Sequence, residues 1–143
     1  MLMTYGRISF DLKNNLSELE TLYKNLEYFG ESLGLSQETI FKINLALEEL
    51  VSNIISYGYT DDDEHWIKIA ISLENRFLVI SLEDDGMPFN PAEATEPDCG
   101  CPVEDREIGN LGIHLCKQFM DDLIYERRGN KNIVILRKYV EDI

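Results

Sequence analysis

The chain has 143 residues, a length typical of one domain, with 44% apolar and 28% charged residues, as in globular proteins. Its 13 lysines and arginines against 27 aspartates and glutamates give a net charge of −14, which argues against nucleic acid or anionic lipid as a direct partner. We expect a cytoplasmic protein, because no long apolar span and no leader are recognisable and the three cysteines fit reduced thiols.

The N-terminal part of the chain predicts a strand and then a helix. Partial alternation of apolar and polar residues predicts a strand over residues 4–12. Apolar residues at three- and four-residue spacing predict a helix over residues 15–33. Ser17 and Glu20 have the spacing of a capping box at its start, and Gly34 is expected to end it.

A second helix is predicted from Ser36, as N-cap, to Tyr57, with Gly58 ending it. Its apolar residues fall on one face about 100° wide, which is typical of a helix packed on a core. Glu49 and Asn53 are one turn apart and should point together. We expect this pair on the side of the helix opposite the apolar face.

The remaining elements predict an α+β fold. Strands are expected at residues 66–73, 77–83, 123–128 and 132–139, a helix at residues 109–120, and an irregular loop at residues 84–107. A loop of this length in a small domain is usually functional, often a lid. The order predicts a two-layer sandwich in which helices cover one face of a mixed, mostly antiparallel sheet, in a single domain over residues 1–143.

Three sets of residues are candidates for chemistry. The first is Glu49 with Asn53, since a carboxamide oxygen is a Mg²⁺ ligand and a carboxylate accepts protons. The second is the segment 83–89, EDDGMPF, where a carboxylate at a strand end is followed by a glycine that allows close approach of a ligand. The third is the segment 109–112, GNLG, whose backbone N–H groups open a helix and suit an anion.

Each set taken alone has a plainer interpretation. The Glu49–Asn53 pair is more often solvated helix surface, Asp-Gly is a common turn, and glycines often loosen a helix start. The segment 109–112 matches neither a Rossmann nor a Walker motif. Cys99, Cys101, His114 and Cys116 have no spacing typical of a zinc site.

The three sets in this order change that balance. The segment ALEELVSNIISYGY resembles the N box of the GHKL ATP-binding superfamily, which includes gyrase, Hsp90, histidine kinases and MutL. LEDDGMPFNP looks like its first glycine box, and GNLGIHLCKQF like its second. The closest resemblance is to the bacterial anti-sigma factor serine/threonine kinases, and it extends over residues 5–138.

This resemblance implies a Bergerat-type ATP-binding fold and a role for each motif residue. Asn53 would ligate Mg²⁺ and Glu49 would be the general base, while Asp84 would bond the adenine amino group and Gly86 would give the ring room. The phosphate site implied by the second glycine box comprises Gly109, Leu111 and Gly112.

The resemblance also implies ATP and Mg²⁺ as cofactors, a sigma factor and an anti-sigma antagonist protein as partners, and a homodimer. Two residues depart from the superfamily pattern: Pro88 and Asn110 each replace a frequent glycine. The change at Asn110 leaves a second hypothesis open, a nucleotide-dependent interaction module that binds ATP and a partner without transferring phosphate. A purely structural adaptor is disfavoured, because Asn53, Asp84 and Gly112 are all present.

Overall fold

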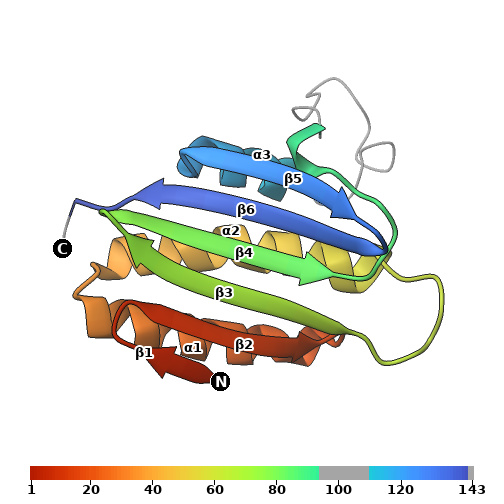
Figure 1. Cartoon of the computed structure of the whole chain (residues 1–143), viewed down its shortest axis with the longest axis horizontal. Coiled ribbons are helices and arrows are strands. Elements are labelled where there is room, and N and C mark those ends of the chain that lie inside the picture. The colour runs from red at the N-terminus through yellow and green to blue at the C-terminus, as the bar shows by residue number, and fades with distance from the viewer. Residues whose placement is uncertain (94–109, 142–143) are drawn as a thin grey trace.

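The computed structural model describes residues 1–93 and 110–141. Alternating buried and exposed residues build its six-stranded sheet, in the order β1-β2-β3-β4-β6-β5 (Figure 1). The strands are β1 (Leu2–Thr4), β2 (Arg7–Lys13), β3 (Trp66–Glu74), β4 (Phe77–Asp84), β5 (Asp122–Arg128) and β6 (Lys131–Tyr139). Every strand pair in the described residues is antiparallel, so the expected α+β sandwich is confirmed, but its sheet is not mixed.

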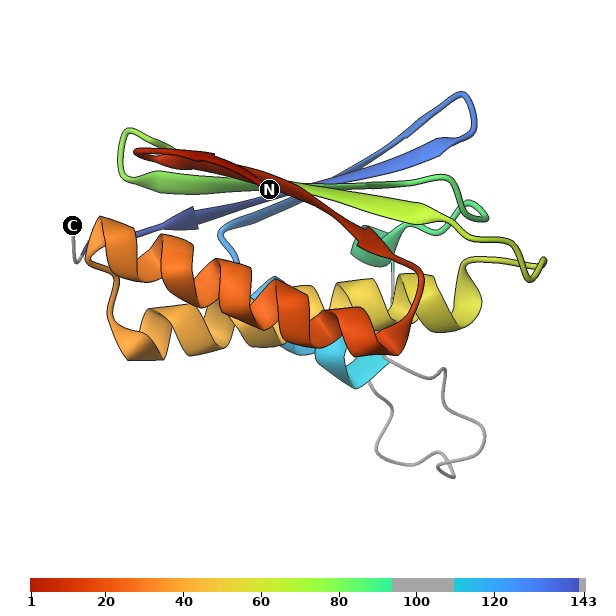
Figure 2. The same cartoon turned by 90° about the horizontal axis from the view of Figure 1, so that it is seen from below.

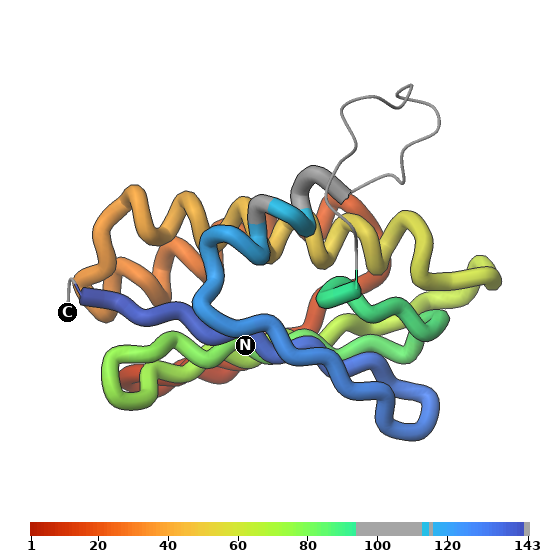
Figure 3. The backbone as a smooth tube through the Cα atoms, turned by 90° about the horizontal axis from the view of Figure 1, so that it is seen from above, coloured from red at the N-terminus to blue at the C-terminus, as the bar shows by residue number. Residues whose placement is uncertain are grey.

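The helices α1 (Leu19–Leu33), α2 (Gln37–Tyr57) and α3 (Asn110–Phe119) cover one face of the sheet (Figure 2). Figure 3 shows α3 beside α2, and the two helices are in contact. The core lies between the layers and is built mainly from leucine, isoleucine, valine and phenylalanine on the inner faces of α1, α2, β2, β3, β4 and β6, with Ile113 and Cys116 of α3. No helix in the described ranges is long and apolar enough to span a membrane.

The second helix forms as the sequence predicts. Ser36 is its N-cap, with the side-chain oxygen accepting the Thr39 N–H at 3.1 Å, and the helix ends at Tyr57 before Gly58. Ile40, Ile43 and Leu47 are at most 1% exposed. This helix is therefore fixed to the core along its length, which gives a firm support for polar side chains on its flank.

Two expectations for the N-terminal segment are wrong. Residues 4–12 are not one strand, because Gly6, at a φ of +80°, turns the chain between β1 and β2. Ser17 does not cap a helix. Instead Asn15 accepts the Ser17 N–H at 3.0 Å and starts a 3₁₀ turn, η1 (Leu16–Glu18), before α1. Gly34 ends α1 as predicted, in a left-handed conformation.

The C-terminal half agrees with the predicted elements to within about two residues. Asn75 and Arg76, both at positive φ, form the two-residue turn between β3 and β4. The predicted irregular segment contains one 3₁₀ turn, η2 (Pro91–Glu93), and its remainder after residue 93 lies outside the described residues. The last two predicted strands, β5 and β6, pair as a hairpin around Gly129.

Candidate functional site

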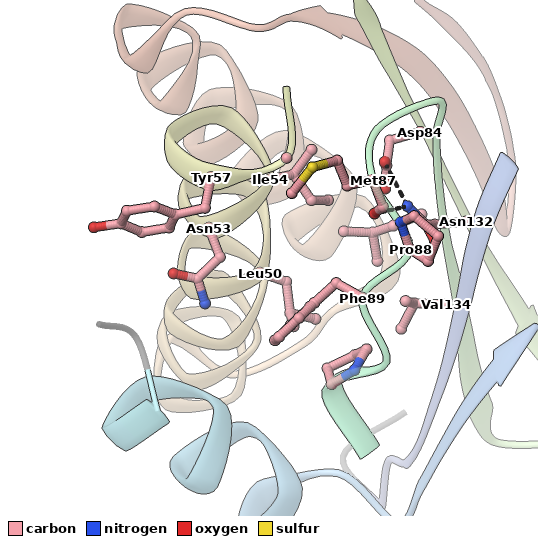
Figure 4. A pocket seen from close by; sticks show the side chains of 13 residues that line it. Leu50, Asn53, Ile54, Tyr57, Asp84, Met87, Pro88, Phe89, Asn132 and Val134 are labelled. Atoms are coloured by element: carbon pink, nitrogen blue, oxygen red, sulfur yellow. Dashed lines mark hydrogen bonds between the residues drawn. The ribbon is translucent and has the colours of Figure 1, made fainter. Parts of the chain in front are cut away.

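A cavity of about 330 Å³ lies between α2 and the adjacent ends of β4 and β6 (Figure 4). It is lined by Leu50, Asn53, Ile54, Tyr57, Gly58, Leu82, Asp84, Met87, Pro88, Phe89, Pro91, Asn132 and Val134. Most of these side chains are apolar, and Asp84 is the one carboxylate among them. An apolar cavity of this size with few polar groups is typical of a small-molecule site.

Asp84 occupies the last position of β4 on the face of the sheet that carries the core. Its side chain is buried, and Oδ1 accepts hydrogen bonds from the Gly86 N–H at 2.8 Å and from Asn132 Nδ2 at 3.0 Å. Burial raises the pKa of Asp84, although these two bonds act in the opposite direction. Oδ2 accepts no hydrogen bond within the described ranges, so it is available to a donor in the cavity.

Gly86 brings the loop after β4 against the end of α2. The Met87 N–H donates to the Gly58 carbonyl oxygen at 2.7 Å. A Cβ atom on Gly86 would lie 2.6 Å from the same oxygen, closer than van der Waals contact permits. The glycine is therefore required by a backbone contact within the protein, whereas the sequence suggested only that it leaves room for a ligand.

Asn53 lies beside Leu50 and Ile54 at the edge of the cavity (Figure 4). The sequence predicted Asn53 on the side of α2 opposite its apolar face. Instead, Asn53 lines the same cavity as the apolar residues Leu50 and Ile54. Its Nδ2 atom is buried and has no hydrogen-bond partner in the part of the chain that the structure describes. Since buried polar groups are nearly always paired, this amide fits a ligand with oxygen atoms at the cavity.

Glu49 lies one turn before Asn53 on α2 and does not line the cavity. Burial raises the pKa of its carboxyl group, and the neighbouring Glu48 raises it further. A raised pKa brings a carboxylate closer to the range in which it accepts a proton effectively at neutral pH. The structure therefore places Glu49 one turn from Asn53 but outside the lining of the cavity, and its role as a base stays a prediction.

The second glycine box is covered only in part. Gly109 lies outside the described residues, as do Cys99 and Cys101, while Leu111 and Gly112 are in the first turn of α3. The phosphate-binding role of these residues stays a prediction. Cys116 on α3 belongs to the core, and burial raises the pKa of its thiol to about 12.

Sequence reasoning missed Asn132, which is buried opposite Asp84 in the register of β4 and β6. A signal was present: Asn132, Val134 and Leu136 alternate on the core face of β6, so a polar residue there needs a buried partner. Only the pairing of β6 with β4, which the sequence did not predict, identifies that partner as Asp84.

A second polar cluster, formed by Tyr59, Asp61, His65 and Asp85, lies beside the loop after β4. His65 contacts Asp61 through Nε2 at 2.7 Å and Asp85 through Nδ1 at 3.0 Å. Its ring stacks on Tyr59 with centroids 4.1 Å apart. These contacts connect the segment between α2 and β3 to the residue next to Asp84, so they support the wall of the cavity from outside.

Comparison with known proteins gives one family. The sequence model of the family described as "Histidine kinase-like ATPase domain" matches residues 12–138 of this chain. The chain is 26% identical over 128 residues to the serine/threonine-protein kinase BtrW of Bordetella bronchiseptica, covering 87% of this chain and 90% of that protein. It is 27% identical over 116 residues to an anti-sigma F factor of Clostridium novyi, covering 80% and 81%.

Solved structures share the fold. The structure of the RsbU and RsbW domains of Rv1364c from Mycobacterium tuberculosis aligns with a TM-score of 0.68 at 16% identity, over 93% of this chain and 32% of that one. A histidine kinase domain from Erythrobacter litoralis EL346 aligns with a TM-score of 0.55 at 18% identity, over 87% and 60%. These likenesses confirm the expected architecture of the sheet and its helices.

Proposed function

Because the chain belongs to the histidine kinase-like ATPase domain family, we propose that it binds ATP in the cavity between α2 and the sheet. We further propose that it is an anti-sigma regulator, which binds a sigma factor and phosphorylates a serine or threonine of an antagonist protein. The observation that carries the proposal is the buried Asp84, with one oxygen available inside a largely apolar cavity. The names of its relatives, a serine/threonine kinase and an anti-sigma F factor, support the choice of activity.

The cavity suits a purine ring held by one polar contact. Leu50, Ile54 and Val134 supply apolar walls on opposite sides (Figure 4). Asp84 accepts a hydrogen bond from the exocyclic amino group, because an ionised carboxylate only accepts. The single polar contact orients the ring, and the apolar contacts supply most of the binding free energy.

The phosphates would extend from the cavity toward Asn53. Mg²⁺, the hard cation that accompanies ATP in such reactions, would be held by the Asn53 amide oxygen and would neutralise phosphate charge. The buried Nδ2 of Asn53 has no partner in the described residues, which supports a phosphate oxygen as acceptor at this position. Gly109 and the backbone of Leu111 and Gly112 would complete the phosphate site.

In the transfer step, the hydroxyl oxygen of the partner's serine or threonine bonds to the γ-phosphorus while the bond to the β–γ bridging oxygen breaks, and ADP leaves. Glu49 takes the hydroxyl proton. Most of the rate acceleration in such reactions comes from positioning and charge stabilisation, so the loss of one proton acceptor slows transfer without abolishing it.

A second candidate is a module that binds ATP and a partner protein without transferring phosphate. The position of Glu49 favours it, because this carboxylate does not line the cavity. The two candidates share the nucleotide site and differ only in the fate of the γ-phosphate. We also propose that the chain works as a homodimer.

Two substitutions on α2 test the kinase against the module. Asn53→Ala removes a metal ligand and should weaken both Mg-ATP binding and transfer. Glu49→Gln should leave Mg-ATP affinity within about twofold and lower transfer by roughly 10²–10⁴-fold. The measurements are ATP affinity by calorimetry and labelling, with ATP carrying a γ-³²P label, of proteins encoded by neighbouring genes.

Glu38→Gln is the control, since Glu38 is an exposed carboxylate in the first turn of the same helix and is paired with Lys42, far along α2 from Glu49. Transfer at the wild-type rate by the Glu49→Gln variant would exclude the general-base role. Wild-type protein that binds Mg-ATP but labels no partner would favour the module.

A further inference from the structure

We propose that Asn132 is the residue that sets the base specificity of the nucleotide site. By holding Asp84 as a fixed acceptor, it makes the cavity select a 6-amino purine over a 6-oxo purine. This inference rests on the proposed function, because it concerns the nucleotide that the same cavity binds. Asn132 acts through Asp84 and is a positioning residue.

The donor side of the Asn132 amide joins the two sides of the loop after β4. Nδ2 donates to Asp84 Oδ1 at 3.0 Å and to the Met87 carbonyl oxygen at 2.9 Å, with a longer contact of 3.4 Å to the Gly86 carbonyl oxygen. Both Asn132 and Asp84 are at most 4% exposed. The amide therefore fixes the side chain of Asp84 and the backbone of the cavity wall together.

The acceptor side of the same amide determines which way it points. Asn132 Oδ1 accepts from the Tyr125 hydroxyl at 2.6 Å and from Arg127 Nη1 at 3.2 Å. A guanidinium group only donates, so the atom facing Arg127 must be the amide oxygen, and the amino group must face Asp84. Arg127 Nη1 also donates to the Gly86 carbonyl oxygen at 2.8 Å, which closes the network.

This arrangement leaves one oxygen atom of Asp84 available to a ligand. Oδ1 already accepts from Asn132 and from the Gly86 N–H, so Oδ2 is the atom available to a base. An ionised carboxylate accepts from a 6-amino group but meets a 6-oxo group as acceptor against acceptor. Such an unpaired polar contact in a buried site is strongly unfavourable, and it is the source of selectivity.

Selectivity also requires that Asp84 stays ionised. Burial and Asp85 raise its pKa, whereas the hydrogen bonds from Asn132 and Gly86 and the charge of Arg127 lower it. The other titratable groups nearby are Tyr59, whose pKa Asp84 helps to raise, and His65, which binds Asp85. Loss of the Asn132 donor should raise the pKa of Asp84, and a protonated carboxyl could then donate to a 6-oxo group.

The test compares the affinities for Mg-ATP and Mg-ITP, which differ at position 6 of the base, by calorimetry at several pH values. Asn132→Asp keeps the shape and the acceptor atom but removes the donors. Asn132→Ala removes both without adding charge. Tyr125→Phe removes one bond on the acceptor side and serves if the Asn132 variants do not fold. Asn130→Ala is the matched control, an exposed asparagine in the same hairpin turn.

We expect the wild type and Asn130→Ala to prefer ATP. Both Asn132 variants should lower the ATP-to-ITP affinity ratio by about tenfold or more, and Tyr125→Phe by about threefold. As pH is lowered, the preference for ATP over ITP should be lost at a higher pH in Asn132→Ala than in the wild type, because Asp84 would be protonated at a higher pH. A role in folding alone would weaken both nucleotides equally, so an unchanged ratio in the folded variants overturns the inference while leaving ATP binding intact. Wild-type protein that binds neither nucleotide overturns both this inference and the proposed function.

Discussion

Asp84 and Asp85 are neighbours at the end of β4 but lie in different surroundings. Asp84 is buried and bonded to Asn132 and to the Gly86 N–H, and it lines the cavity. Asp85 is one-third exposed and contacts His65 on the other side of the strand end. Because successive side chains of a strand point to opposite faces, one carboxylate faces the cavity and the other contacts His65.

The contact of His65 with two carboxylates predicts a pH-dependent stability. Hydrogen bonds with Asp61 and Asp85 raise the pKa of His65, so the folded state favours its protonated form. Its contribution is complete below the ordinary histidine pKa of about 6.5 and is lost as pH rises through the higher folded-state value. His65→Gln should therefore lower the free energy of unfolding more at about pH 6 than at about pH 9.

Urea unfolding of wild type and variant at both pH values measures this difference directly. The comparison between proteins at each pH removes the contributions of other titrating groups, such as Glu49 and Asp84, which both proteins share. A stability difference that is the same at both pH values would show that the His65 contacts do not depend on its charge.

At the scale of single residues, the sequence predicts the site residues that lie in a recognisable short segment. Asp84 and Asn53 stand out because they lie in recognisable segments, and the structure places both at one cavity. Asn132 and Arg127 did not stand out, because their partners are more than 40 residues away in sequence. Such a contact becomes visible only when the strand order and register are known.

At the scale of elements, helix caps and apolar periodicity decide what the sequence predicts correctly. Helix α2 has a strong cap and a continuous apolar face, and its bounds agree with the prediction. The first strand was predicted wrongly because alternation continues through the turn at Gly6. The cap at Ser17 was wrong because Asn15 accepts the Ser17 N–H and starts the turn two residues earlier, so Ser17 lies inside η1.

Gly86 tests how the loop after β4 is held against α2. In Gly86→Ala, the new Cβ would lie 2.6 Å from the Gly58 carbonyl oxygen and 3.0 Å from Asp84 Oδ1. The loop must then move, which should cost roughly 1–3 kcal/mol of unfolding free energy. We expect ATP affinity to fall as well, because the displacement includes Asp84 and Met87.

Gly34→Ala provides the control, measured by chemical unfolding and calorimetry alongside Gly86→Ala. Gly34 has a φ of +79° in the turn between α1 and α2, and a Cβ there meets nothing within 4 Å. It should lose stability through backbone strain and keep its ATP affinity. Equal ATP affinity in Gly86→Ala and wild type would mean that the cavity does not depend on this contact.

At the scale of the whole molecule, composition and element order are enough to predict the architecture, but not how the strands pair. Within residues 1–93 and 110–141, the helices cover one face of the sheet and nothing covers the other (Figure 2). Directly paired residues Ala70, Ser81, Ile135 and Ile124 form a row across that open face, and Ile124 is 52% exposed. A row that is apolar at three of its four positions, on the open face of the sheet, supports the proposed homodimer.

Light scattering coupled to size-exclusion chromatography tests the homodimer. We expect a mass twice the 16.5 kDa of one chain at micromolar concentration. Ile124→Asp should shift the mass toward that of one chain, because it places a charge in the row, whereas Tyr28→Asp, on the exposed side of α1, should not. A wild-type mass of 16.5 kDa under these conditions would refute the homodimer.

Calorimetric titration of Mg-ATP into the wild type, Asp84→Asn and Asp85→Asn tests the central claim most directly. The wild type should bind one ATP per chain, and Asp84→Asn should bind at least about tenfold more weakly, because an amide can present a donor where the adenine amino group needs an acceptor. Asp85→Asn, changed in the same way one residue along, should bind within about threefold of wild type. No binding by the wild type, or equal affinity in wild type and Asp84→Asn, would contradict an adenine site at Asp84.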